Sequence, residues 1–134
     1  MNSLFEKLTA QFGRNAPASR EAIRQFEVES GVALREDYAA FLMYSNGGEG
    51  FIGGGYAIFW RVEELIENNK SYRVGDFAPD LFLFGSDGGG EAFAFDRRSK
   101  DQVIVSVPFI PLKLECALVL SPTFTGFLEM LSSL

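Results

Sequence analysis

The chain has 134 residues, which is enough for one domain with a buried core, and we expect a single domain over residues 1–134. Hydrophobic residues make up 47% of the chain and charged residues 22%, a composition typical of folded globular proteins rather than disordered or fibrous ones. The formal net charge is −6, and the part after Arg24 carries eight basic and sixteen acidic residues. Such a charge disfavours direct binding of nucleic acid and would attract a basic protein.

The sequence contains no histidine, and its one cysteine is Cys116. Histidine is the usual general base and the commonest transition-metal ligand, so its absence argues against Ser-His and Cys-His catalysis and against histidine metal sites. Cys116 lies in the apolar segment LKLECALVL, where we expect a buried and inert thiol. We therefore expect no catalytic residue, no cofactor and no metal site.

The single cysteine cannot form an internal disulfide, and the start of the chain, MNSLFEKLTAQFGRN, lacks the basic residues and continuous apolar stretch of a secretory signal. No segment has the uninterrupted apolar length that a membrane span requires. We expect a cytoplasmic protein that does not bind a membrane.

The first third of the chain has helical patterns. Ser3 and Glu6 form a capping-box pattern that predicts a short first helix ending at Gly13. The apolar face of this helix would consist of Leu4, Phe5, Leu8 and Phe12. Ser19 is the predicted N-cap of a second helix that ends near Gly31. Its apolar face would consist of Ala22, Ile23 and Phe26.

A third helix is predicted to begin at Glu36 and Asp37, where negative charge suits the helix dipole. Helical spacing then continues to Asn46-Gly47-Gly48 through Tyr38, Phe41, Leu42 and Ser45.

After Gly48 the patterns favour strands over five segments, residues 56–60, 81–84, 92–95, 103–107 and 118–120. Val103, Val105 and Val107 share one face of their strand, as Phe93 and Phe95 do of theirs. Short links between the middle strands predict antiparallel hairpins, interrupted by one helix from Val62 to about Asn69. Ser121 and Pro122 predict the N-cap and first position of a closing helix. The buried stripe of this helix would be Phe124, Phe127, Leu128 and Leu131. This order predicts an α+β fold: an antiparallel β-sheet meander with helices packed on it, N-terminal helices first and a C-terminal helix last.

Residues 48–53 spell G-x-G-x-x-G, but a helix precedes them and a strand follows, the reverse of the order in a dinucleotide site. We interpret them as a loop whose glycines take positive φ angles where a helix stops.

The segment from Leu83 to Arg98, LFGSDGGGEAFAFDRR, combines glycines with three carboxylates, Asp87, Glu91 and Asp96. Calcium-loop spacing is absent, and a glycine turn flanked by solvated charge is favoured over a metal site or an acid-base pair. Phe84, Phe93 and Phe95 would then anchor this hairpin in the core. Two roles are left open for Asp87: its side chain either stabilises the turn or contacts a basic partner.

Three segments, taken in order, resemble the SUKH superfamily. Residues 33–48, ALREDYAAFLMYSNGG, are similar to its Leu-Pro-x-Asp-Tyr…Phe-Leu…Asn-Gly-Gly signature, with Arg35 in place of the proline. Residues 83–96, LFGSDGGGEAFAFD, resemble its Phe-Gly-x-Asp-Gly-Gly-Gly…Phe-x-Phe-Asp hairpin. Residues 124–128, FTGFL, resemble its closing Ser-Phe-x-x-Phe-Leu, with Thr123 in place of the serine.

The resemblance implies an α+β fold and, in bacteria, an immunity protein that binds and neutralises a cognate polymorphic toxin, often a nuclease. Such a toxin would be basic and would suit the acidic chain. The candidate partner contacts are Glu49, Tyr56, Trp60, Asp87, Glu91 and Asp96. Tyr56 and Trp60, with Phe51 nearby, are either core residues or anchors for a partner, and the core is favoured.

Two alternatives accompany this interpretation. One is an intracellular interaction scaffold or regulator with an endogenous partner, as the resemblance to fungal members implies. The other is an enzyme that uses Asp87 with Glu91 or Asp96. The sequence does not indicate an oligomeric state.

Overall fold

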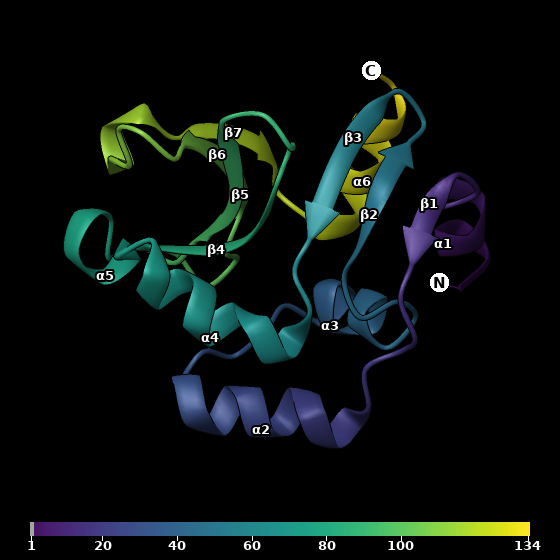
Figure 1. Ribbon diagram of the computed structural model, residues 1–134, viewed down its shortest axis with the longest axis horizontal. Helices are drawn as coiled ribbons and strands as arrows, with labels where there is room; N and C mark the ends of the chain where they lie inside the picture. The colour runs from purple at the N-terminus through teal and green to yellow at the C-terminus, as the bar shows by residue number, and fades with distance from the viewer. Residues whose placement is uncertain (1) are drawn as a thin grey trace.

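Seven antiparallel strands form one sheet in which spatial order equals chain order, from β1 to β7, with helices on both faces (Figure 1). The structure is a computed structural model that describes residues 2–134. This arrangement confirms the predicted α+β meander with N-terminal helices and a C-terminal helix. The elements are α1 (Asn2–Leu8), β1 (Phe12–Arg14), α2 (Arg20–Ser30), α3 (Glu36–Leu42), β2 (Gly48–Ile52), β3 (Gly55–Phe59), α4 (Val62–Ser71), α5 (Val74–Phe77), β4 (Leu81–Ser86), β5 (Glu91–Asp96), β6 (Ile104–Pro108), the 3₁₀ helix η1 (Leu114–Cys116), β7 (Leu118–Ser121) and α6 (Phe124–Ser132).

The second and third helices are confirmed. The Ser19 hydroxyl accepts a hydrogen bond from the Ala22 N–H at the start of α2, and Gly31 ends that helix in the left-handed conformation. Helix α3 begins at Glu36 as predicted but ends at Leu42, so that Ser45 lies beyond it.

The prediction for the first helix is wrong at both ends. Ser3 lies inside α1 rather than before it, and the helix ends at Leu8 instead of Gly13. The Thr9 hydroxyl donates to the Phe5 carbonyl, and the chain then turns so that Phe12 begins β1. The buried Phe12 ring packs against Phe41 and Phe59, a tertiary contact that overrides the helical spacing.

The predicted loop at residues 48–53 is also wrong, because most of it is strand β2, which pairs with β1 on one side and β3 on the other. The positive φ angles are present at Gly48, Gly50 and Gly53. At Gly48 a Cβ atom would lie 2.5 Å from the Phe12 ring, so the close approach of β1 requires glycine. Glycine has low strand propensity, which is why the pattern did not indicate a strand.

The five predicted strands are confirmed as β3 to β7, and the fourth helix as α4. Phe84, Phe93 and Phe95 belong to the main core together with side chains of α3 and α6, which confirms that they anchor the hairpin. Val105 and Val107 face a smaller second core closed by α5 and the β6–β7 loop. Both faces of β4 to β6 are therefore covered.

Asn69 bridges the place where β3 diverges from β4, since only Ile58–Ser86 and Phe59–Gly85 pair these two strands. The side-chain amide of Asn69 donates to the Leu83 carbonyl and accepts from the Leu83 N–H, both at 2.9 Å. It therefore replaces the missing strand partner of β4, whose backbone groups would otherwise be buried without hydrogen bonds.

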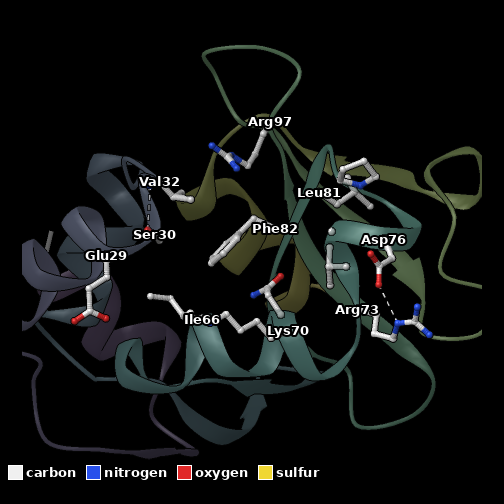
Figure 2. A pocket seen from close by; sticks show the side chains of 14 residues that line it. Glu29, Ser30, Val32, Ile66, Lys70, Arg73, Asp76, Leu81, Phe82 and Arg97 are labelled. Carbon is white, nitrogen blue, oxygen red and sulfur yellow. Dashed lines mark hydrogen bonds and ion pairs between the residues drawn. The ribbon is translucent and has the colours of Figure 1, made fainter.

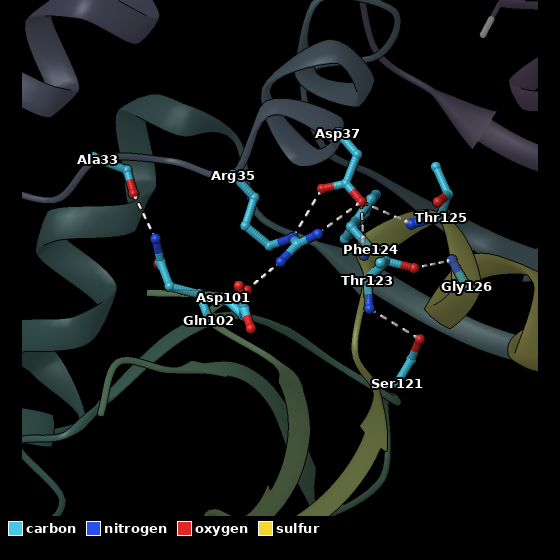
Figure 3. Close-up of polar contacts among 10 residues, drawn as sticks. All are labelled: Ala33, Arg35, Asp37, Asp101, Gln102, Ser121, Thr123, Phe124, Thr125 and Gly126. Carbon is cyan, nitrogen blue, oxygen red and sulfur yellow. Dashed lines mark hydrogen bonds and ion pairs between the residues drawn. The ribbon is translucent and has the colours of Figure 1, made fainter. Parts of the chain in front are cut away.

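The predicted start of the closing helix is wrong by two residues. Ser121 is the last residue of β7, and α6 begins at Phe124 after the N-cap Thr123, whose hydroxyl accepts from the Gly126 N–H. The carboxylate of Asp37 also accepts from the N–H groups of Phe124 and Thr125, at 2.9 and 3.3 Å (Figure 3). Thr123 and Asp37 together therefore supply the cap that was expected from Ser121.

Two short elements, α5 and η1, were not predicted. Cys116 lies in η1, beside the start of β7, and is half-buried, so the expectation of a buried thiol is wrong. No helix within residues 2–134 combines the length and apolar character needed to cross a membrane.

Candidate functional site: an aromatic band bordered by carboxylates

The β2–β3 hairpin brings two of the predicted contact residues together. The Tyr56 hydroxyl donates a hydrogen bond to the Glu49 carboxylate on the neighbouring strand. This bond raises the pKa of Tyr56 above its ordinary value, because losing the phenol proton would place two negative charges side by side. Phe51, paired with Tyr56 across the strands, packs edge-on against its ring at 5.1 Å and is 49% exposed.

The turn between β4 and β5 lies beside Tyr56. Oδ1 of Asp87 accepts from the Gly89 N–H at 2.7 Å and from the Glu91 N–H at 3.2 Å, so Asp87 has the turn-stabilising role that the sequence allowed. A Cβ atom on Gly88, whose φ is +80°, would lie 3.2 Å from the Tyr56 ring. Glycine at this position lets the turn lie against Tyr56.

The same turn leads to a second group of aromatic rings. The Phe109 N–H donates to the Gly90 carbonyl at 3.0 Å. The Phe109 ring lies 4.6 Å from that of Tyr72, which in turn stacks on Trp60 at 6.0 Å. Tyr72 is 45% exposed, and Trp60 and Phe109 are half-buried.

The β4–β5 turn thus lies between two groups of aromatic rings, which we together call the aromatic band: Phe51 with Tyr56, and Phe109 with Tyr72 and Trp60. The sequence offered Tyr56 and Trp60 as candidate contacts, although it favoured the core for them and for Phe51, and it missed Tyr72 and Phe109. Trp60 packs against both cores, whereas Phe51 and Tyr56 belong to neither. Tyr72 follows the end of α4 and Phe109 follows β6, so no local pattern links them to the hairpin. The β4–β5 turn, which joins them in space, was recognised only as a turn.

Two hollows adjoin the aromatic band. Glu49 and Trp60 line one of 440 Å³ together with Glu64 and Asn68. Tyr72 and Phe109 line the other, of 690 Å³, with the exposed Phe77 and Ile110. The rim of the second hollow holds two cations and two carboxylates, Arg73, Lys113, Asp76 and Glu115. The positive and negative charges at the rim of the second hollow are therefore equal in number.

Four of the six predicted residues, Glu49, Tyr56, Trp60 and Asp87, thus adjoin or belong to the aromatic band, and the half-buried Glu91 begins β5 next to the turn. Asp96 lies at the opposite end of β5. It is buried and forms an ion pair with Arg98, with Nη2 of Arg98 2.7 Å from Oδ2 of Asp96. Hydrogen bonds from Arg98 lower the pKa of Asp96.

The chemistry of the aromatic band suits non-covalent recognition. Exposed aromatic rings provide large contact area at low entropic cost, and carboxylates beside them can pair with basic side chains. Within residues 2–134 no three histidine, cysteine, aspartate or glutamate side chains cluster in a way that could hold a metal ion.

Comparison with known families gives one match. The model of the SMI1 / KNR4 family (SUKH-1) matches residues 17–130, which include all elements from α2 to β7 and most of α6. No curated protein matches the sequence. The matched region contains the three segments that resemble the SUKH superfamily, and it covers most of the chain. This protein therefore belongs to the SMI1 / KNR4 family (SUKH-1).

Proposed function

We propose that this protein is a non-enzymatic immunity protein that binds and neutralises a basic protein toxin, with the aromatic band as its binding surface. The observation that carries the proposal is the band itself, two groups of aromatic rings on either side of the β4–β5 turn, with Glu49 and Asp87 beside them. Aromatic anchors surrounded by polar residues are the usual centres of binding energy in protein interfaces. Membership of the family and the net charge of −6 support the same function.

The hollow beside Trp60 suits a basic side chain of the toxin. Glu49 and Glu64 provide carboxylates there, and Arg61 offsets part of this charge through its ion pair with Glu64 at 3.6 Å. An inserted arginine could stack on the Trp60 indole while it pairs with Glu49. A toxin that acts on nucleic acid needs such basic residues for the phosphate backbone, so their capture would block its substrate.

Co-expression with the toxin encoded by the neighbouring reading frame tests this function. We expect cells that carry both genes to survive, and the variant Glu49→Lys/Glu91→Lys to lose protection because it repels a basic partner. Glu6→Lys/Glu21→Lys changes the charge equally on the exposed faces of α1 and α2 and should keep protection. Protection by both variants would contradict the role of the carboxylates, and absence of protection by the unchanged chain would contradict immunity.

Affinity capture from unstressed cells separates immunity from an endogenous scaffold. Immunity predicts that the captured partner is the product of the linked toxin gene. A constant partner encoded elsewhere, recovered through the aromatic band, would instead favour the scaffold.

A further inference from the structure

A further cavity of 510 Å³ opens between α2, α4 and β4 (Figure 2). Its floor is apolar and is formed by Val32, Ile66, Leu81 and Phe82. This volume falls in the range of sites for small organic ligands, which are concave and mostly apolar with a few polar groups that fix orientation. None of the aromatic band residues lines the cavity.

Two cations lie on opposite sides of this floor. Figure 2 shows Arg97 above and Lys70 below, with the Phe82 ring between them. Among residues 2–134, neither side chain has an ion-pair partner.

The other charged groups of the cavity restrict the ligand further. Arg73 forms an ion pair with Asp76 at 2.9 Å and lies over the Phe77 ring, so these two charges largely cancel. The Glu29 carboxylate on α2 accepts a hydrogen bond from the Gln25 side-chain amide. The cavity as a whole favours one negative charge near Arg97 and Lys70, whereas Glu29 and Asp76 would repel a polyanion such as a nucleotide phosphate.

We propose that this cavity binds a small aromatic carboxylate, with the ring on Phe82, the carboxylate paired with Arg97, and Lys70 on the other side of the ring adding to the positive potential. A guanidinium can hold a carboxylate through two parallel hydrogen bonds, and the ammonium of Lys70 adds a point charge. The ring would contact Phe82 and the aliphatic side chains of Ile66 and Val32. This site contains no residue of the aromatic band, although Arg73 and Asp76 line both this cavity and the second hollow.

Titration of the full chain with 2-naphthoate, followed by the backbone amide signals in NMR, tests the proposal. We expect saturable shifts at Asn69, Phe82 and Arg97, and binding at least about tenfold weaker for the neutral analogue 2-naphthamide. Arg97→Gln should weaken 2-naphthoate binding about tenfold and Lys70→Gln about threefold. Lys7→Gln removes the same charge from α1 and should leave affinity unchanged.

Equal affinity for the acid and the amide would overturn the proposal, as would shifts that do not saturate or that lie outside the cavity. Unchanged affinity in both Arg97→Gln and Lys70→Gln would overturn it as well. Urea unfolding of each variant shows whether a loss of affinity reflects loss of the fold. Both charges lie at the protein surface, so we expect unfolding midpoints close to that of the unchanged chain.

Discussion

Aspartate residues of this protein differ in role according to their surroundings. Asp37 joins α3 to α6, because its carboxylate accepts hydrogen bonds from two backbone N–H groups of α6 (Figure 3). It also forms an ion pair with Arg35 at 3.0 Å. Asp87 holds a turn, and the exposed Asp76 pairs with Arg73 in solvent. The sequence indicated the helix start at Asp37 and the turn at Asp87. It could not indicate the bond to α6, which joins residues 87 positions apart.

Replacement of Asp37 by alanine should destabilise the fold. The side chain of Asp37 is only 13% exposed, and its removal leaves the first N–H groups of α6 without their carboxylate and Arg35 without its partner. We expect Asp37→Ala to lower the free energy of unfolding by about 2–3 kcal/mol, measured by urea denaturation. Asp76→Ala, which breaks an ion pair that is mostly in solvent, should cost less than about 1 kcal/mol. Equal losses in the two variants would contradict this role of Asp37.

Asp96 should contribute stability that depends on pH. Its pKa in the folded protein is lowered by Arg98, so its contribution is complete above the ordinary aspartate pKa of about 3.9 and is lost as the pH falls through the folded value. Asp96→Asn should therefore be less stable than the unchanged chain at pH 7, by about 1 kcal/mol, because Arg98 is largely in solvent. The difference should shrink at pH 3. A difference that stays constant between urea denaturation curves at the two pH values would contradict the assignment.

At the scale of elements, regular amphipathic segments could be predicted and the irregular ones could not. Helices α2 and α3 follow their apolar periodicity, and strands β3 to β7 follow runs rich in apolar residues. Strands β1 and β2 depend on glycines that allow close approach of neighbouring strands, and the N-terminus of α6 depends on Asp37. In each of these cases a partner distant in the chain determines the local structure.

Gly85 shows this dependence at the junction of β3 and β4. A Cβ atom there would lie 2.2 Å from the Ile58 carbonyl oxygen, which belongs to the backbone and cannot move aside easily. We expect Gly85→Ala to lower the free energy of unfolding by about 1–3 kcal/mol. Gly90→Ala is the matched control, since no atom lies within 4 Å of its Cβ position and its φ is not positive. Equal unfolding midpoints for the two variants would contradict the steric clash that we expect between a Cβ atom at residue 85 and the Ile58 carbonyl oxygen.

At the scale of the whole molecule, the sequence motifs and the candidate binding surface are mostly different residues. Asp37, Gly85 and Phe124 belong to the segments that resemble the SUKH superfamily, and each maintains the fold. Phe51, Tyr72 and Phe109 lie outside those segments. The family could therefore be predicted from the sequence, whereas the aromatic band requires the fold that brings its members together.

The net charge of −6 should accelerate the encounter with a basic toxin. We expect the association rate constant to fall about tenfold between 50 and 500 mM salt in stopped-flow measurements, with a smaller change in the dissociation rate constant. A rate constant for association that does not depend on salt would contradict electrostatic steering.

The central claim is that the aromatic band binds the toxin, and the equilibrium dissociation constant of the complex tests it most directly. Phe51 and Tyr72 are each about half exposed, so Phe51→Ala/Tyr72→Ala should fold while it loses two anchors of the interface. Calorimetric titration with the purified toxin domain should show affinity weakened at least about 100-fold for this variant. Val28→Ala, which removes an exposed apolar side chain from α2, should bind within about twofold of the unchanged chain. Affinity of Phe51→Ala/Tyr72→Ala equal to that of the unchanged chain would contradict the claim.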